Sequence, residues 1–289
     1  MKKSKTTIQC YLCGNKEKFH QEGVTRDACE IGVLKCEVCG LIFLESASHI
    51  SEGFYENSGM HVEDAPLERW IRETAWDDDR RFLYLQRNIE NKSVLDVGCG
   101  NGGFITRARP VALRCDGVEP ETRLHKYFQQ KQYNVYSAIH EVRDRYDIIT
   151  LFHVLEHMPD PRSSLVSLGE KLHARGEIII EVPNANDALL SLYQNPGFMK
   201  FAYWSCHLFV FNEQTLAMLI KQAGYKAKYI KQIQRYPLSN HLHWLSRGKP
   251  GGHKEWAFLD SAELHAAYEK QLAALGLCDT LVSCIQRDN

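Results

Sequence analysis

The sequence has no long apolar segment. Its longest apolar stretches, such as 148–152 and 178–180, are far shorter than the ~20 residues that a membrane-spanning helix needs. Its first nine residues are polar and basic with no apolar stretch behind them, which does not fit a secretory signal. We therefore expect a cytoplasmic protein with no membrane partner.

The chain also lacks an excess of charge of either sign. It has 35 Lys and Arg against 36 Asp and Glu, a formal net charge of -1. A polyanionic partner would need a local basic patch, so the composition disfavours nucleic acid binding. What is present is a chain of 289 residues, 44% hydrophobic and 25% charged, which is enough for one large core and a minor appendage. Nothing in the sequence predicts an oligomeric state.

Cysteine is the residue type that stands out, because four of the ten cysteines form a doubled motif. Two CxxC pairs, each followed directly by glycine, are separated by 22 residues: Cys10, Cys13, Cys36 and Cys39. A CxxC turn brings two thiolates to one metal ion, and a second turn completes a tetrahedral four-sulfur site that suits zinc. A redox pair would need only one CxxC in a βαβ context. Residues 1–45 are therefore predicted to be a zinc-ribbon-like module whose zinc is structural and not catalytic.

A linker and a helix are predicted after this module. Residues 46–66 are polar and rich in turn residues, which indicates a linker or a lid. Over 67–89 apolar residues recur at helical spacing, and Asp77, Asp78 and Asp79 are expected to form the solvated face of that helix. We expect residues 46–90 to be linker, lid and packing helix.

From Ser93 onward, short apolar runs alternate with amphipathic segments. Strands are expected at 94–97, 115–118, 146–151, 177–182 and 229–234, and helices at 103–109, 121–131, 161–173 and 212–223, before a last helix near 260–275 and a last strand near 279–286. This alternation predicts an α/β fold with a Rossmann-like, mainly parallel sheet, helices on both faces, and ligands at the carboxyl ends of the strands. The main domain is expected to span 91–289, with an insertion near 235–258.

The run VLDVGCGNGG, residues 94–103, follows the first of these strands and opens a helix. Its glycines let the backbone approach a ligand closely, but their spacing fits a dinucleotide as well as S-adenosylmethionine. Asp96 separates the two, because a carboxylate would repel a pyrophosphate and attract the ammonium and sulfonium of S-adenosylmethionine. Its alternative role is to cap the following helix. Glu119 ends the next strand, where a carboxylate accepts both ribose hydroxyls, so the predicted cofactor site comprises Asp96, Gly98, Gly100, Asn101, Gly102 and Glu119.

Four motifs together resemble those of one enzyme family. VLDVGCGNGG, GVEP at 117–120, YDIITLFHVLEHMPDP at 146–161 and IIIEVPN at 178–184 look like the successive motifs of class I S-adenosylmethionine-dependent methyltransferases. The form with a doubled CxxCG module in front is similar to methyltransferases of sugar and surface-polysaccharide biosynthesis.

The resemblance implies roles for individual residues. Asp96, Gly98 and Gly100 would hold the methionine moiety and Glu119 the ribose, while the residues lining the pocket beneath the transferred methyl would be Phe152 and His153. Many members of the family also carry an acid for the adenine amino group, where this chain has SAIH at 137–140.

Methyl transfer to a hydroxyl or an acidic carbon also needs a general base, and histidine titrates near neutral pH. His153 ends a strand beside the expected cofactor crevice. His207, in YWSCHLF at 203–209, resembles the acceptor-side histidine of related enzymes and is the better candidate base. His157 either belongs to the same site or only caps or braces the next helix. Tyr55 is the third catalytic candidate, because it lies in the linker where related enzymes fold a lid over cofactor and acceptor. Asn184 comes directly after a strand and is expected to face the pocket and bind the acceptor.

The segment 235–253 is dense in aromatic, amide and cationic side chains. Trp244 suits stacking on a sugar face and Arg235 suits a phosphate, so together with His241 they predict an acceptor-binding insertion. A metal site of His241, His243 and His253 is disfavoured, because no carboxylate pattern accompanies them. The plainer alternative for the whole segment is a surface hairpin.

Three functions therefore compete. The preferred one is methylation of a small polar acceptor, namely a sugar, a nucleotide sugar or a surface-glycan component. RNA methylation would need a basic face on the zinc module, whose cations are offset by acids. The third is a catalytically silent cofactor-binding protein that uses the zinc module for association.

Overall fold

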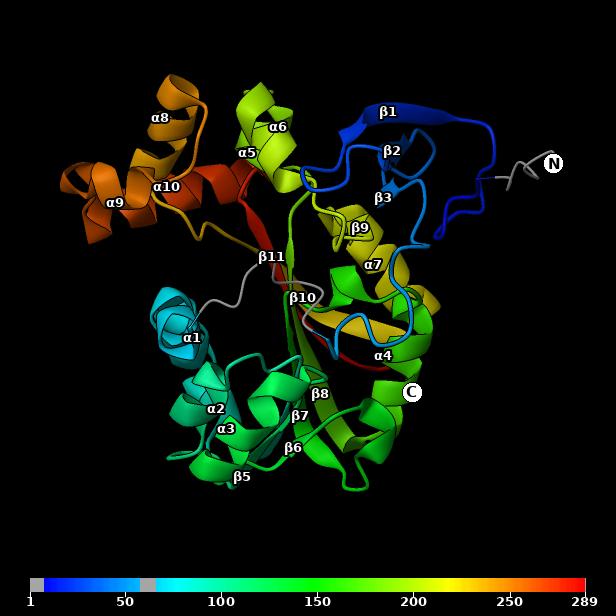
Figure 1. Cartoon of the computed structure of the whole chain (residues 1–289), viewed down its shortest axis with the longest axis vertical. Coiled ribbons are helices and arrows are strands. Elements are labelled where there is room, and N and C mark those ends of the chain that lie inside the picture. The colour runs from blue at the N-terminus through cyan, green and yellow to red at the C-terminus, as the bar shows by residue number, and fades with distance from the viewer. Residues whose placement is uncertain (1–7, 58–65, 289) are drawn as a thin grey trace.

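A seven-stranded sheet forms the centre of the computed structural model, which describes residues 8–57 and 66–288 (Figure 1). Its strand order is β10-β11-β8-β7-β4-β5-β6. The strands are β4 (Ser93–Val97), β5 (Arg114–Val118), β6 (Val135–Tyr136), β7 (Tyr146–Phe152), β8 (Leu172–Pro183), β10 (Tyr225–Ile233) and β11 (Thr280–Arg287). Only β11 runs antiparallel to its neighbours, so the predicted Rossmann-like, mainly parallel sheet is confirmed.

The chain enters this sheet at β4, which lies next to the middle strand β7. From β4 it moves outward through β5 and β6, and then returns to β7 on the other side of β4. Connections on the two sides therefore diverge at the carboxyl ends of β4 and β7, and such a point leaves a crevice in which open α/β sheets bind ligands. The fold thus predicts the place of the site before any side chain is considered.

Helices cover both faces of the sheet because successive side chains of a buried strand point to opposite sides. In β4, Val94 packs into a cluster with helices on one face, while Leu95 and Val97 pack into the cluster on the other. The first face carries α1 (Leu67–Ile89), α2 (Gly103–Ala108), the short η1 (Thr122–Leu124) and α3 (His125–Lys131). The second carries α4 (Pro161–Glu170) and α7 (Glu213–Gln222), and η2 (Ile139–Glu141) and η3 (Leu155–His157) are single turns between elements.

Helix α1 has the predicted bounds but not the predicted solvated face. Asp78 is 6% exposed, and Asp77 pairs with Arg80 and Arg235 instead of with water. Only Asp79, with its side chain 62% exposed, lies at the surface as expected. The prediction was wrong for the first two acids because arginines of α1 itself and of other elements pair with them.

A second sheet joins the N-terminal module to the main domain. Its order is β1 (Phe19–Val24), β2 (Gly32–Cys36), β3 (Ile42–Leu44) and β9 (Phe209–Val210), and the last strand comes from the far side of the sequence. Ile42 pairs with Val210 and Phe43 with Phe209. The module also shares one apolar cluster with the large sheet. None of these four short strands was predicted.

Several short helices stand with the module above the carboxyl edge of the large sheet (Figure 1). They are α5 (Ala188–Ser191), α6 (Pro196–Ala202), α8 (Leu238–Arg247), α9 (Gly252–Glu255) and η4 (Ala257–Leu259), with the longer α10 (Ala262–Leu275) behind them. The segment 235–258 is thus helical and not a hairpin. Two strands begin earlier than predicted, β8 at Leu172 and β10 at Tyr225.

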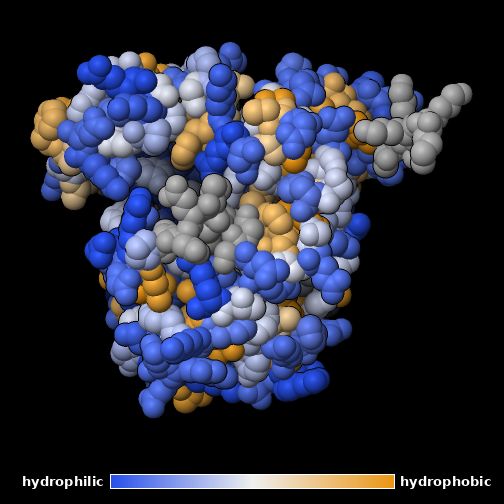
Figure 2. Space-filling view, in the orientation of Figure 1, coloured by the Kyte–Doolittle hydropathy of each residue, from blue (hydrophilic) through white to orange (hydrophobic). Residues whose placement is uncertain are grey.

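The surface agrees with the balanced composition. Figure 2 shows a face that is largely hydrophilic, with apolar side chains in scattered patches. Within the described residues, no helix combines the length and the apolar character needed to cross a bilayer. Part of the predicted lid, residues 58–65, lies outside the described residues.

Candidate active site

Asp96 lies near the carboxyl end of β4, beside the crevice that the topology predicts. It is 3% exposed, and Thr150 on the neighbouring β7 donates its hydroxyl to Asp96 Oδ1 at 2.7 Å. Burial raises the pKa of Asp96 to about 7. Because one neutral hydroxyl offsets only part of the cost of ionising a buried carboxylate, this position favours a positively charged ligand.

The glycine-rich turn follows directly. Gly98, Gly100 and Gly102 have φ of 68, 52 and 73 degrees, a region that L-residues with a Cβ rarely adopt. Asn101 closes the turn, since its Oδ1 accepts from the amide of Gly103 at 3.0 Å and its Nδ2 donates to a threonine hydroxyl on α1 at 2.9 Å. The turn is therefore held in place on both sides.

Glu119 follows β5 and meets this turn. Its Oε2 accepts from the amide of Gly100 at 2.8 Å and its Oε1 from the amide of Glu121 at 3.0 Å. It is 9% exposed, and burial raises its pKa to about 7. The two predicted cofactor carboxylates thus lie at the ends of adjacent parallel strands, and Glu119 is hydrogen-bonded to the glycine turn that follows Asp96.

Phe152 is the last residue of the neighbouring strand β7, and His153 follows it. The ring of Phe152 lies edge-on to Phe104 with centroids 5.0 Å apart. His153 has a φ of 56 degrees, and Arg235 Nη1 lies 3.0 Å from its Nε2. Its Nε2 also lies 3.3 Å from Glu181 Oε1, and its Nδ1 lies 3.2 Å from Glu156 Oε1. The imidazole of His153 is therefore held between two buried carboxylates and a guanidinium at the edge of the crevice.

The other predicted catalytic residues meet nearby. His157 Nδ1 donates to the carbonyl of Cys206 at 2.7 Å, and Tyr55 donates its hydroxyl to the carbonyl of His157 at 3.1 Å. The rings of His157 and His207 are 5.0 Å apart. Burial lowers the pKa of His207 to about 3, which keeps its imidazole neutral and makes it a weak base. The alternative that His157 caps the next helix is wrong, because Asp160 is the N-cap of α4.

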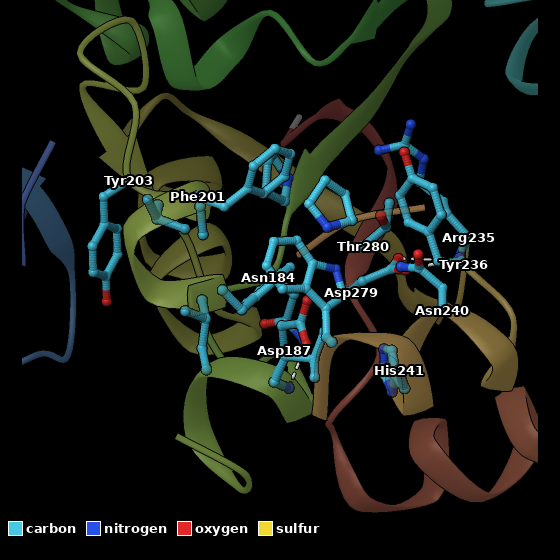
Figure 3. Close-up of a pocket in the computed structure, with 18 of the residues that line it drawn as sticks. Asn184, Asp187, Phe201, Tyr203, Arg235, Tyr236, Asn240, His241, Asp279 and Thr280 are labelled. Atoms are coloured by element: carbon cyan, nitrogen blue, oxygen red, sulfur yellow. Dashed lines mark hydrogen bonds between the residues drawn. The ribbon is translucent and has the colours of Figure 1, made fainter. Parts of the chain in front are cut away.

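A pocket of about 220 Å³ opens beside these histidines. In Figure 3 Phe201 and Tyr203 lie on the side of the N-terminal sheet, with Arg235 and Tyr236 on the opposite side. His153 and His207 both line it, so the pocket reaches the residues that follow β7. We call it the acceptor pocket.

The four residues predicted to bind the acceptor all line this pocket, but their polar atoms have partners within the protein. Asn184 Nδ2 donates to the carbonyl of Cys278 at 2.7 Å, and His241 Nδ1 lies 2.6 Å from the hydroxyl of Tyr268. Trp244 is 2% exposed and packs against two phenylalanines. Arg235 pairs with an aspartate of α1, so its charge is met inside the protein and not by a phosphate.

Sequence reasoning missed the charged network that supports the site. Glu181, at the end of β8 and 1% exposed, accepts from Arg80 at 2.8 and 2.9 Å and from Arg81 at 2.8 and 3.0 Å. These guanidinium groups and that of Arg235 also surround Asp77. The acid–base run DDDRR at 77–81 was the available signal, but its main partner lies about 100 residues away.

The four cysteines of the N-terminal module converge as predicted. Their sulfur atoms all lie within 4.8 Å of one another, and the pairs Cys10–Cys39 and Cys13–Cys36 are 3.5 Å apart. The sulfurs of a tetrahedral zinc thiolate are roughly 3.8 Å apart for a Zn–S bond of ~2.3 Å. The glycines after each pair, at 14 and 40, have φ of 71 and 84 degrees. This donor set fits a structural zinc ion with no vacant position.

A family of proteins described as methyltransferase domain matches residues 68–229, which is more than half of the chain. The chain belongs to this methyltransferase family. The matched part contains β4, the glycine turn, Glu119 and the β7 edge.

Similar curated proteins act on different acceptors. A ubiquinone biosynthesis O-methyltransferase of Hydrogenovibrio crunogenus is 26% identical over 142 residues, which cover 40% of this chain and 58% of that protein. A tRNA U34 carboxymethyltransferase of Vibrio vulnificus is 28% identical over 142 residues, which cover 45% of this chain and 42% of that protein. The chain thus spans about half the length of these relatives.

Solved structures share the fold at low identity. A SAM-dependent methyltransferase from Archaeoglobus fulgidus has a TM-score of 0.51 at 18% identity, covering 76% of this chain and 99% of that one. Magnesium protoporphyrin IX methyltransferase from Synechocystis PCC 6803, with bound SAH, has a TM-score of 0.50 at 13% identity, covering 83% and 100%. The predicted methyltransferase fold is confirmed, whereas the similarity to sugar methyltransferases stays a prediction.

The crevice of this methyltransferase fits S-adenosylmethionine. Asp96 and Glu119 are both acidic and buried, and each has a raised pKa that a nearby positive charge would lower again. The turn is also tightly packed, since a Cβ at Gly98 would lie 2.4 Å from Val154. The donor set of the cysteines fits zinc in the same sense, and both groups would be held by residues already in place.

Proposed function

We propose that this methyltransferase transfers the methyl group of S-adenosylmethionine to a small polar acceptor in the acceptor pocket. The observation that carries the proposal is the pair of buried acids Asp96 and Glu119 beside His153, which lines the pocket. Asp96 and Thr150 are opposite in register on β4 and β7, and His153 follows three residues after Thr150. Donor site and pocket are thus only a few residues apart.

The methyl donor supplies an electrophilic carbon on a sulfonium, and the chain has to hold and align its partners. In this proposal Asp96 holds the ammonium of the methionine end, and Glu119 accepts from the ribose hydroxyls. Asn101 and Gly102 keep the turn in shape through their contacts with α1 and α2. Phe152 and the lid residue Tyr55 exclude water from the space between donor and acceptor.

The acceptor is proposed to be a sugar, a nucleotide sugar or a surface-glycan component. A pocket of about 220 Å³ accommodates a group of monosaccharide size and not a folded nucleic acid. Its lining mixes rings such as those of Phe201 and Trp244 with polar groups such as Asn240 and Asp187. Aromatic faces beside hydrogen-bonding groups suit a ring that has apolar faces and hydroxyls. Such an acceptor agrees with the cytoplasmic location predicted from the sequence.

RNA methylation is the second candidate, because one group of similar proteins modifies tRNA. Arg26, a cation of the module that also lines the pocket, lies 4.9 Å from the ring centroids of both Phe201 and Trp204. Its charge therefore faces aromatic rings, which weakens the case for a phosphate-binding surface there.

A screen with radiolabelled S-adenosylmethionine tests these candidates. The acceptors are a panel of nucleotide sugars, a panel of phenols and total tRNA. We expect label to pass to a nucleotide sugar and none to pass in an Asp96→Asn variant. Label in tRNA alone would overturn the proposed acceptor class. Tight binding of the cofactor without transfer to any acceptor would favour the catalytically silent alternative.

A further inference from the structure

Three ligand-type side chains converge next to the acceptor pocket, which one of them, His207, lines. Ring nitrogens of His157 and His207 and a carboxylate oxygen of Glu156 all lie within 4.8 Å of one another. The first and third of these residues belong to η3, directly after β7, whereas His207 comes from the loop before β9. Two segments about 50 residues apart in sequence thus present two imidazoles and one carboxylate to a common point.

The carboxylate of Glu156 is buried and only half satisfied. The side chain is 0% exposed, and its Oε1 accepts from His153 Nδ1 at 3.2 Å. Its Oε2 has no hydrogen-bond partner among the described residues. Because a buried carboxylate oxygen without a partner is costly and rare, this atom calls for a cation.

The imidazole of His157 is oriented as a metal ligand would be. Its Nδ1 donates to the carbonyl of Cys206 at 2.7 Å, which leaves a lone pair on Nε2. A backbone carbonyl that fixes the tautomer in this way is the usual outer partner of a ligating histidine. The same hydrogen bond also anchors the loop of His207, the residue that follows Cys206.

We propose that Glu156, His157 and His207 bind one divalent metal ion, separate from the zinc of the cysteine cluster. Two imidazoles and one carboxylate suit Mn²⁺, Fe²⁺ or Zn²⁺ and leave coordination positions open. Ligand atoms at ~2.1 Å from an ion are up to ~4.2 Å apart, so small side-chain rotations close the present cluster around an ion.

The inference deepens the proposed function and rests on it for one step. Because His207 lines the pocket, an ion held by it would lie within reach of an acceptor there, which would bind the ion through a hydroxyl oxygen. That hydroxyl gives its proton to solvent, its oxygen forms the new bond to the methyl carbon, and the carbon–sulfur bond breaks with its electron pair on sulfur. The ion eases the loss of the proton, and His207 serves as a ligand and not as the base.

Binding of the metal is tested without any methyl transfer. Zinc-loaded full-length protein is titrated with Mn²⁺ and followed by electron paramagnetic resonance, because Mn²⁺ prefers carboxylate and imidazole to thiolate. We expect one Mn²⁺ per chain in the parent, and binding at least tenfold weaker in Glu156→Gln and in His207→Ala. Glu255→Gln is the matched control: its carboxylate also lies beside a histidine, His243, at 3.2 Å, and its binding should equal that of the parent.

The variants differ in their structural risk. Glu156 is fully buried, whereas His207 lines a pocket, so His207→Ala keeps the test decisive even if the first variant unfolds. Mn²⁺ binding that is equal in the parent and in His207→Ala would overturn the inference. Methyl transfer that runs at full rate in protein free of this metal, with the structural zinc retained, would overturn the acceptor step. If the metal binds but no acceptor is methylated, the proposed metal site stands and the proposed function is refuted.

Discussion

Replacing Asp96 by asparagine separates the charge of this side chain from its shape. In the parent the Thr150 hydroxyl donates to Asp96 Oδ1 at 2.7 Å. An asparagine keeps an oxygen that can accept this hydrogen bond, and it keeps the volume of the side chain. What it removes is the negative charge of a group that is 3% exposed. The variant should therefore fold like the parent and differ in how it binds a cation.

The effect on stability follows from the raised pKa. In the ligand-free protein burial raises the pKa of Asp96 from 3.8 to about 7. Stability from this group is fully present below its unfolded pKa and is lost as pH rises through about 7, so ionised Asp96 costs at most about 4 kcal/mol at pH 8. Without ligand, Asp96→Asn should thus have a higher melting temperature than the parent at pH 8. The two melting temperatures should converge near pH 4.

The effect on binding has the opposite sign. Removing one partner of a buried charge pair costs ~2–5 kcal/mol, which is roughly 30-fold to several thousand-fold in Kd for S-adenosylmethionine. Because the parent has to lose protons from Asp96 and Glu119 to bind the cation, its Kd should also rise as pH falls from 8 to 6, and more steeply than that of Asp96→Asn.

Calorimetry at pH 8 measures the Kd for S-adenosylmethionine in the parent, in Asp96→Asn and in a matched control variant. Asp116 on the neighbouring strand β5 is 6% exposed and accepts from the Tyr146 hydroxyl at 2.7 Å. It pairs with Leu95, so its side chain points to the face of the sheet opposite to that of Asp96. Asp116→Asn should bind the cofactor like the parent. If Asp96→Asn also does, the electrostatic argument for the donor site is refuted.

Further predictions concern the supports of the site. Cys36→Ser should release the zinc, measured by metal analysis, and weaken acceptor binding more than cofactor binding in calorimetry. Glu181→Ala leaves two guanidinium groups without their buried partner and should lower the free energy of unfolding by ~3–5 kcal/mol in urea titrations, while Glu177→Ala, whose partner Lys228 is half exposed, should change it by less than ~1 kcal/mol. Gly98→Ala forces a Cβ to 2.4 Å from Val154 and should abolish cofactor binding, whereas Gly224→Ala, with nothing within 4 Å, should retain it.

The sheet and the donor site could be predicted because their determinants are local. Strand β4, the turn and α2 are contiguous, so an apolar run, glycines of positive φ and a following amphipathic segment identify them directly. Asp96 and Glu119 were placed together because parallel neighbouring strands end at the same edge. The cysteine cluster was equally accessible, since the spacing of two CxxC motifs depends only on turn geometry.

The acceptor side could not be predicted in the same way, because its contacts are distant in sequence. Nothing around residue 235 indicates that Arg235 pairs with Asp77, and the run DDDRR at 77–81 contains only two of the three guanidinium neighbours of Asp77. A run of charged residues predicts a solvated surface unless the residues that pair with it in the fold are known. The short strands β1–β3 have too few residues for a clear period, and one edge of their sheet is completed by residues 209–210.

Contacts between residues distant in sequence also connect the structural zinc site to the acceptor pocket. Cys36 ends β2, β2 pairs with β3, and β3 pairs with β9, only two residues after His207. Asp27 of the module accepts from Ser205 at 2.6 and 3.0 Å, which fixes the other end of that loop. The part of the pocket wall that carries His207 is therefore attached to the module, whereas the donor turn is built on the large sheet. For this reason we propose that the module and the main domain fold as one unit, and that loss of zinc moves the acceptor wall before it disturbs the donor site.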